Sequence, residues 1–466
     1  MKIPRNSLAL AFLVFLTLLS GCSKKETQVF SSLKSRANAA QLKNFVAEKV
    51  LQANSATNQQ LPEFAAYFAA AQKGDWLAVS NDFENLRKNV NSSAWEAEGR
   101  RNGSRWAAVL ELWGAFYYFG HADEKYSAAF GNDIIQSIPP GSIYFGGTDP
   151  GRFVVTAMEK SQVNGDPFFT LTQNALADPT YLDYVRSIYG DRLYIPTSED
   201  AQHCFQDYLD DAARRQTRRQ LKPGENIYLD KDGHLQVRGQ VAVMEINARL
   251  LRVIFDHNTN RDFYIEESFP LDWMYPHLEP HGLIMKINRE PAEKLSEDVL
   301  QADHDYWTKY LAPIIGDWLN DNTTVQEVAA FAEKTYGKKN LSGFKGDRRF
   351  LASTDAQMMF SKLRSSIGGI YSWRVGVSPT GGQVPPQYLG NKERMAREAD
   401  FAFRQAFALC PYSPETVYRY TAFLMNQGRK PDALLIAQTA VKVDPKNGQF
   451  RSLVATIASQ SMDHRP

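Results

Sequence analysis

The sequence predicts an α/β central domain with a mostly parallel sheet, flanked by N-terminal helices and by a C-terminal all-helical region. Apolar residues recur at helical spacing in residues 39–138 and again in residues 293–460. Between them, residues 139–292 contain short apolar runs that alternate with helical patterns. Strands that alternate with helices predict a parallel sheet in an α/β layer. Hydrophobic residues make up 43% of the chain, which is enough for large cores.

Residues 1–21 have the pattern of a lipoprotein signal peptide. A basic start precedes an apolar run over residues 8–19, which is too short to span a bilayer. The segment "LSGC", residues 19–22, resembles a bacterial lipobox, in which Cys22 receives acyl chains such as palmitate that hold the protein on a membrane. The other interpretation is an ordinary signal peptide with an unmodified cysteine. Because Ser23 rather than Asp follows, the resemblance favours the outer membrane, on the side facing the periplasm.

Residues 22–38 are polar and predict a tether, and residues 39–138 predict helices. A Lys-Gly-Asp break at residues 73–75 divides one helical stretch and predicts a helix-turn-helix. Four aromatic residues farther along have the spacing of a helix core. Core packing is therefore the expectation for them, with a carbohydrate-binding platform as the alternative: Trp106, Trp113, Phe116 and Tyr117.

Residues 139–292 carry the strand and helix patterns of the α/β domain. Predicted strands cover residues 142–147, 167–173, 192–197, 261–268 and 280–288. Predicted helices between them cover residues 152–162, 178–190, 198–220 and 241–258. Ser198 is expected to cap the helix that it starts. The basic stretch 214–222 is expected to be a solvated helix end and linker.

The loop after the first predicted strand, "GGTDPGR", is the main candidate site. Its glycines permit a sharp turn with positive φ, and Thr148 or Asp149 is placed to cap the following helix. A helix N-terminus at the end of a strand attracts anions, and Arg152 would be a second contact. Asn174 and Thr197 stand at neighbouring strand ends. The candidate ligand-binding residues, for a small anion or a sugar, are Gly146, Gly147, Thr148, Asp149, Arg152 and Asn174.

A tight corner without a ligand is the competing interpretation of this loop. It matches neither the dinucleotide-binding glycine pattern nor the phosphate-binding loop. Asp149 would also repel an anion unless another charge pairs with it.

The sequence predicts no catalytic residues, no cofactor and no metal. The 53 basic and 52 acidic residues give no charge argument for nucleic acid as a partner. No Gly-x-Ser-x-Gly elbow occurs, so a serine nucleophile has no support. His277, Glu279 and His281 resemble a metal cluster, but the neighbouring prolines argue against one. Cys204 and Cys410 are expected to be buried free thiols, or a disulfide if the oxidising compartment joins them.

The end of the chain contains a repeat pattern. Small and aromatic residues before a Pro have the spacing of a tetratricopeptide repeat, in which two antiparallel helices meet through small side chains. The second unit is nearly complete and the first is irregular, with a long inserted loop; a generic helical hairpin is the alternative. The defining positions are Ala399, Phe403, Ala406 and Pro411, then Tyr420, Leu424, Gly428, Ala433, Ala437, Ala440 and Pro445. Residues 293–460 are thus predicted to be a tetratricopeptide-like helical region, since such units need neighbours to bury their faces.

Three stretches within residues 126–289 resemble the soluble part of a bacterial family of membrane proteins, the protein O-mannosyltransferase-like glycosyltransferases. The stretches are "FGNDIIQSIPPGSIYFGGTDPGRF", "FFTLTQNALADPTYLDYVR" and "RDFYIEESFPLDWMYPHLEPHGLIMKIN". Residues 147–149 and Phe153 match the family's first loop in part, and Asn174 and residues 181–184 lie at the second. Residues 281–283 stand where the family has Glu-Gly-Leu. The family's soluble part is often followed by tetratricopeptide-like helices, as here.

The sequence departs from this family in one important respect. The family's transferases use acidic residues on loops between many membrane helices, and this sequence has no such series of apolar segments. The resemblance therefore implies a shared soluble fold and a link to glycosylation or glycan export, without glycosyl transfer itself.

We therefore expect an envelope-anchored scaffold that binds a protein partner through its helical repeats and a membrane through its lipid. The alternatives are a ligand- or glycan-binding module, or an enzyme, with its site at residues 146–152, and a purely structural lipoprotein.

Overall fold

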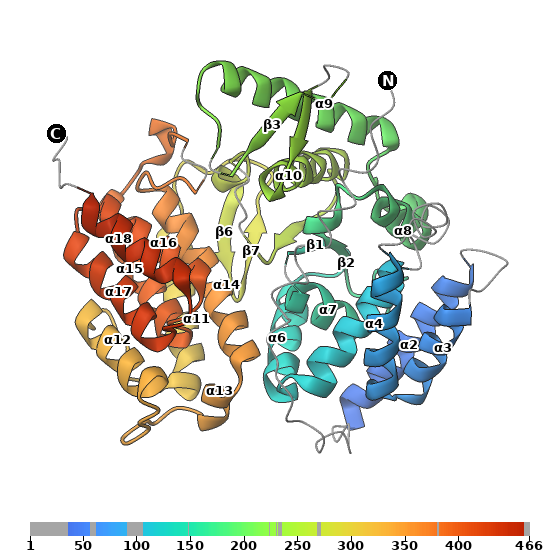
Figure 1. Cartoon of the computed structure of the whole chain (residues 1–466), viewed down its shortest axis with the longest axis horizontal. Helices are drawn as coiled ribbons and strands as arrows, with labels where there is room; N and C mark the ends of the chain where they lie inside the picture. Colours follow the sequence, from blue (N-terminus) through green and yellow to red (C-terminus); the bar gives the residue numbers. More distant parts are fainter. Residues whose placement is uncertain are drawn as a thin grey trace. The chain divides into compact units, whose positions relative to one another are not determined.

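The computed structural model describes residues 36–55, 62–90, 106–147, 149–222, 224–229, 231, 235–267, 272–379 and 382–460. The predicted signal peptide with Cys22, and most of the predicted tether, lie outside these residues. The chain divides into two compact units, Met1–Phe263 and Tyr264–Pro466. It is mostly helical, with a five-stranded sheet and a separate two-stranded sheet (Figure 1). Among the described residues, no helix combines the length and the apolar character needed to cross a membrane.

Unit 1 begins with the helices that the sequence predicts. They are α2 (Arg36–Ser55), α3 (Pro62–Lys73), α4 (Trp76–Val90), a helix over residues 106–116 that continues as the π-helical turn η2 (Tyr117–His121), and α6 (Glu124–Ser137). Gly74, with a φ of 70°, makes the turn between α3 and α4 and confirms the helix-turn-helix. The ring of Phe83 stacks on those of Trp106 and Trp113. These aromatic residues thus pack on one another in the helical layer.

The α/β part of unit 1 follows. Its elements are β1 (Ile143–Gly146), α7 (Asp149–Met158), β2 (Phe169–Thr172), η3 (Gln173–Ala175), α8 (Pro179–Tyr189), η4 (Gly190–Arg192), α9 (Ser198–Thr217), β3 (Asn226–Leu229), β4 (Leu235–Arg238) and α10 (Gln240–His257). β1 and β2 are parallel, with Ile143 opposite Phe169, and every residue of both strands is buried. Complete burial agrees with the continuous apolar runs of the sequence.

The five-stranded sheet has the order β2-β1-β5-β7-β6 and is mixed. β5 (Phe263–Ile265) spans the division between the units, and β6 (Leu278–His281) pairs antiparallel with β7 (Ile284–Ile287). The prediction of a mostly parallel sheet is therefore correct only in part. A two-residue connection at Gly282, whose φ is 61°, joins β6 to β7, and so short a link permits only an antiparallel pair.

Two predictions for unit 1 are wrong, and one pair of strands was not predicted. Residues 192–197, which are all described, form no strand, because the side chain of Asn258 takes the backbone hydrogen bonds of Tyr194 instead, at 2.9 and 3.1 Å. Residues 226–238, for which no strand was predicted, form the antiparallel pair β3–β4. The cap of α9 is Thr197 rather than Ser198, because Thr197 and Asp200 form a reciprocal capping box.

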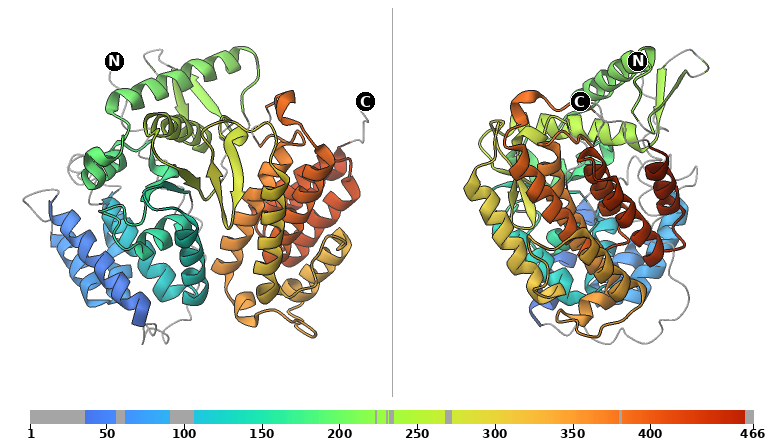
Figure 2. Two further views of the ribbon diagram at one scale, coloured as in Figure 1. Left: turned by 180° about the vertical axis from the view of Figure 1, so that it is seen from behind. Right: turned by 90° about the vertical axis from the view of Figure 1, so that its left-hand side faces the viewer.

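Unit 2 is mostly helical. Besides β6 and β7 it contains η5 (Tyr275–His277), α11 (Glu297–Ile315), α12 (Val325–Ala332), η6 (Glu333–Gly337), α13 (Arg348–Ala352), α14 (Thr354–Trp373), η7 (Pro386–Tyr388), α15 (Lys392–Leu409), α16 (Pro414–Asn426), α17 (Lys430–Val443) and α18 (Gly448–Ser459). Figure 2 shows α14 to α18, in orange to dark red, as neighbouring helices. A Cβ added to Gly368 of α14 would lie 3.0 Å from the ring of Phe403, so a glycine is what lets α14 and α15 pack this closely.

Candidate functional site

The loop between β1 and α7 contains a close approach of backbone to backbone. A Cβ added to Gly146 would lie 2.8 Å from the oxygen of Gly151 and 3.1 Å from the Cα of Arg152. The φ of Gly146 is not positive, so the predicted reason for this glycine is wrong. Its role is to let the end of β1 touch the first turn of α7. Tyr144 supports the same contact by donating a hydrogen bond to the oxygen of Gly151, at 3.2 Å.

The structure brings Asn174 to this loop, as the sequence predicts. The side-chain nitrogen of Asn174 donates to the backbone oxygen of Gly147. Asn174 is held in turn by Asn247, which donates to its backbone oxygen at 3.1 Å. Thr148 lies outside the described residues, and only the helical backbone of Asp149 is described. Thr197 is occupied with capping α9. The described part of the predicted site is thus Gly146, Gly147, Arg152 and Asn174.

Arg152 points into the interior of unit 1. It is 6% exposed, and its guanidinium lies 4.9 Å from the ring centre of Phe153 and 5.8 Å from that of Tyr181. Its Nη2 lies 4.0 Å from Oε1 of Glu111, which is a long distance for an ion pair. Two of its nitrogens, Nε and Nη2, donate no hydrogen bond within the described residues. Arg152 therefore has hydrogen-bonding capacity that the described residues of unit 1 leave unused.

Arg152 belongs to a group of buried polar residues that we call the buried polar cluster: Lys49, Glu111, Arg152, Glu159, Gln162 and Tyr184. Lys49 is fully buried and forms an ion pair of 2.5 Å with Glu111. Its ammonium group also donates to the hydroxyl of Tyr184, at 2.8 Å, and to Gln162. The hydroxyl of Tyr184 donates to Glu111 at 2.6 Å. Lys49 and Glu111 thus offset the cost of their burial by pairing with each other and with polar neighbours.

Burial sets the protonation of this cluster. Burial alone would raise the pKa of Glu111, but the charges of Lys49 and Arg152, with hydrogen bonds from Lys49 and Tyr184, hold it below its usual value. Burial lowers the pKa of Lys49, and the charge of Glu111 offsets only part of this effect. Burial raises the pKa of Glu159 well above its usual value, and the like charge of Glu111 acts in the same direction. Burial therefore favours the neutral form of Glu159.

Lys49 and Arg152 share the carboxylate of Glu111, at 2.5 and 4.0 Å, and the charges of Glu48 and Glu159 also act on Lys49. Further polar atoms of the same unit lack hydrogen-bond partners within the described residues: Oγ1 of Thr156, Oε2 of Glu159 and both side-chain heteroatoms of Gln173. An unpaired buried group costs about 1–3 kcal/mol, so such groups favour a polar or anionic guest.

Sequence reasoning missed Lys49 and Glu111. They lie in helices far along the chain from Arg152, and nothing local connects them. The one available signal is Glu111 itself, an acid inside the apolar helical run "AAVLELWGAF". A lone charged residue on a core-facing helix needs a buried partner, but the sequence does not name that partner.

The other predicted candidates have structural roles. Nδ1 of His277 lies 2.8 Å from the backbone oxygen of Asn288. Among the described residues, no group of three or more His, Cys, Asp or Glu side chains could hold a metal ion. Cys204 and Cys410 are free and buried, as predicted. Burial raises the pKa of Cys204 to about 11 and that of Cys410 to about 12, so both are unreactive thiols at neutral pH.

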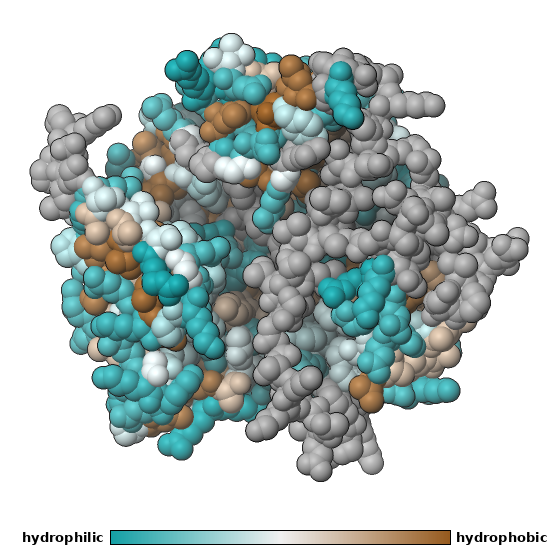
Figure 3. Space-filling model, in the orientation of Figure 1, coloured by the Kyte–Doolittle hydropathy of each residue, from teal (hydrophilic) through white to brown (hydrophobic). Residues whose placement is uncertain are grey.

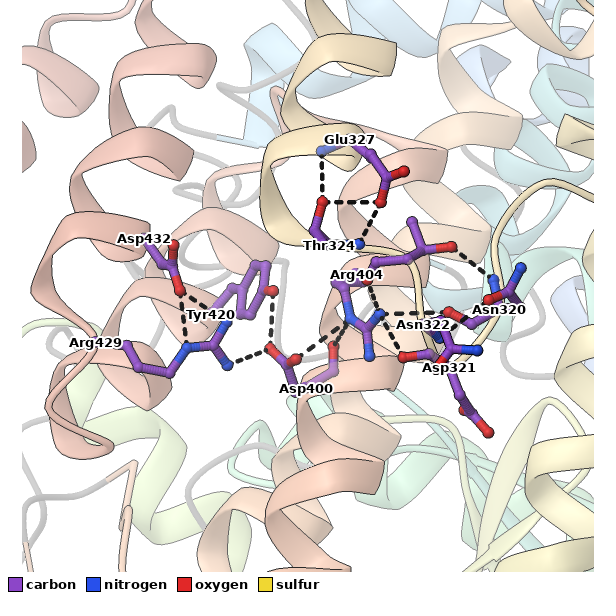
Figure 4. A network of polar contacts seen from close by, with 11 residues as sticks. Asn320, Asp321, Asn322, Thr324, Glu327, Asp400, Arg404, Tyr420, Arg429 and Asp432 are labelled. Carbon is purple, nitrogen blue, oxygen red and sulfur yellow. Dashed lines mark hydrogen bonds and ion pairs between the residues drawn. The ribbon is translucent and has the colours of Figure 1, made fainter.

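A second polar network joins the last helices of unit 2. Figure 4 shows Asp400 of α15 at its centre. Its carboxylate accepts a hydrogen bond from Tyr420 of α16 at 2.9 Å and pairs with Arg429, before α17, at 3.1 Å. Arg404 binds the same carboxylate at 3.3 Å and donates to the backbone oxygens of residues 320, 321 and 323. This network fixes α15, α16 and α17 relative to one another.

Compared with known proteins, the chain matches no protein-family model, and no curated protein or solved structure is significantly similar to it.

Proposed function

We propose that this protein is an envelope-anchored lipoprotein that acts as a protein-interaction scaffold through a tetratricopeptide-like stack of α14 to α18. Acylation of Cys22 would hold it on the outer membrane, facing the periplasm. The sequence resemblance to O-mannosyltransferase-like proteins favours a partner in glycosylation or glycan export. A scaffold needs no catalytic residues, in keeping with the sequence, in which we find no acid/base or nucleophile motif.

The repeated spacing of buried residues is the observation that carries this proposal. The same pattern occurs in α15 and in α17, each time before a proline. α16 and α18 begin at Pro414 and Gly448, which is the 34-residue period of tetratricopeptide repeats. Gly428, with a φ of 71°, makes the turn between the paired helices α16 and α17. The residues that repeat the pattern are fully buried: Ala399, Phe403, Ala406, Ala433, Ala437 and Ala440, each within about 1% of complete burial.

One face of α16 supports a contact with a protein. Tyr418 is 40% exposed, one of the few large hydrophobic side chains in the described residues with so much surface in water. Ala422, one helical turn later, is exposed, and Met425 is half-buried. An exposed aromatic beside small and flexible apolar side chains is typical of protein interfaces.

The test is affinity purification from the native envelope with a matched pair of variants. Ala422→Arg places a long charge on the proposed face, and Gln438→Arg places the same charge on an exposed position of α17. We expect the first variant to lose a co-purifying protein that the second retains. Equal recovery from both variants would contradict the scaffold. The anchor is tested separately, by fractionation of Cys22→Ser at high salt, which screens surface charge; the variant should leave the membrane fraction and the acylated protein should stay in it.

A small-ligand site at residues 146–152 is a second candidate function, favoured by the unused hydrogen-bonding capacity of Arg152 and Gln173. The two guanidinium nitrogens of Arg152 that lack partners within the described residues favour a small anion or an acidic sugar. Thermal unfolding with inorganic phosphate, glucuronate and neutral sugars tests it. We expect an anion to stabilise the native protein and Asn258→Ala, but not Arg152→Gln. Asn258→Ala is the control because the side chain of Asn258 bonds Tyr194 and not Arg152. Absence of any ligand-dependent shift would remove this candidate.

A further inference from the structure

A basic surface lies at the end of α9 and on the hairpin that follows it. Five cationic residues and no acidic residue occur between residues 212 and 222: Arg214, Arg215, Arg218, Arg219 and Lys222. Figures 1 and 2 show α9, β3 and β4 together at one end of unit 1. We call the exposed residues of this end the α9 basic surface: Arg214, Arg218, Arg219, Leu221 and Leu229.

Two of the five cations form close ion pairs that hold the chain in place, and the other three form no such close pair within the described residues. Arg215 binds Glu225, and Lys222 binds Glu245 of α10 at 2.5 Å. These pairs fold the chain after α9 back onto α10 and fix its path. Arg218 and Arg219 are exposed, and neither has an acidic partner among the described residues. Arg214 has a single long contact of 3.6 Å, to Asp211.

The hairpin adds apolar side chains to this charge. Register pairs Ile227 with Val237 and Leu229 with Leu235, so these four side chains share one face of β3–β4. The first pair is buried, whereas Leu229 is 65% exposed and Leu235 is half-buried. Leu221 is a further exposed leucine, at 39%. Figure 3 shows brown side chains beside teal ones at this end of the molecule.

We propose that the α9 basic surface binds an anionic lipid membrane. Exposed cations attract anionic headgroups, and exposed leucines enter the boundary between headgroups and acyl chains. A nucleic acid would use the arginines but would leave the leucines in water. The proposal rests on the lipid anchor of the proposed function, which would hold this surface near a membrane at high local concentration.

Sedimentation with lipid vesicles tests this proposal. The probe is the full chain carrying Cys22→Ser, so that acyl chains play no part, with vesicles of phosphatidylcholine alone or with about one third phosphatidylglycerol. We expect binding to the anionic vesicles only, weakening with added salt. Arg218→Gln/Arg219→Gln should weaken it about 25-fold, since each cation near the surface contributes roughly fivefold. Leu229→Ser should weaken it without changing its salt dependence.

The matched control is Lys338→Gln/Lys339→Gln in unit 2. Lys338 and Lys339 are likewise adjacent and exposed, and Lys339 has a φ of 52° where Arg219 has 57°. The control should bind vesicles like the parent chain. If the two double variants lose vesicle binding equally, net charge alone explains the loss and the proposal is overturned. So would equal binding to neutral vesicles, or displacement from anionic vesicles by single-stranded DNA. Failure here leaves the anchor intact, because fractionation of the acylated protein tests that separately.

Discussion

Glu111→Gln is the sharpest test of the buried polar cluster, because it removes one charge and almost no volume. In the native protein the carboxylate of Glu111 faces both Lys49, at 2.5 Å, and Arg152, at 4.0 Å. The substitution leaves two buried cations beside Glu159, whose pKa is raised by burial. Breaking a buried ion pair in this way costs about 3–5 kcal/mol.

Lys49→Met should cost less, roughly 1–3 kcal/mol, although it removes the closer partner. Glu111 then keeps Arg152 and the hydrogen bond from Tyr184, at 2.6 Å, so one cation still balances one carboxylate. The double variant Lys49→Met/Glu111→Gln should cost less than the two single costs added together, because the pair is already broken by either change.

Hydrogen exchange read segment by segment is the suitable assay, because a chain of two units need not unfold in one step. Protection of backbone amides in α2 and α8 reports the opening of the cluster. The pKa of Glu111 is held low in the folded state, so its stabilisation is present above the unfolded value and is lost as the pH falls through the folded value. Glu111→Gln should remove that acid sensitivity. If Glu111→Gln lowers amide protection less than Lys49→Met does, the carboxylate of Glu111 does not balance both buried cations.

Three further predictions concern single contacts. Gly146→Ala should cost about 1–3 kcal/mol, measured by thermal unfolding, because its Cβ would meet the backbone of α7. A hydrogen bond to Glu398 raises the pKa of His304, so this contact stabilises fully below the unfolded pKa of about 6.5 and is lost as the pH rises through the folded pKa. In His304→Gln the melting temperature should therefore depend less on pH just above that value than it does in the native protein. The same pH dependence in both proteins would contradict this prediction. Tyr420→Phe should lower the free energy of unfolding by roughly 1.5–3 kcal/mol in urea, since the hydroxyl of Tyr420 donates to Asp400 at 2.9 Å. An unchanged free energy of unfolding would show that this hydrogen bond does not stabilise the fold.

Local features of this protein follow from the sequence. The turn at Gly74 and the helices on either side of it depend on neighbours within a few residues, and both are as predicted. The contact of Asn174 with the loop after β1 was also predictable, because adjacent parallel strands end at the same edge of a sheet.

The tertiary structure decided what depends on distant partners. Residues 192–197 have a strand pattern, yet Asn258 rather than a neighbouring strand takes their hydrogen bonds. Gly146 is needed for contact with α7 and not for its own φ. Lys49 and Glu111 meet only because separate helices pack around one interior. A sequence pattern reports the preference of a segment, whereas burial and pairing energies depend on what the folded chain places beside it.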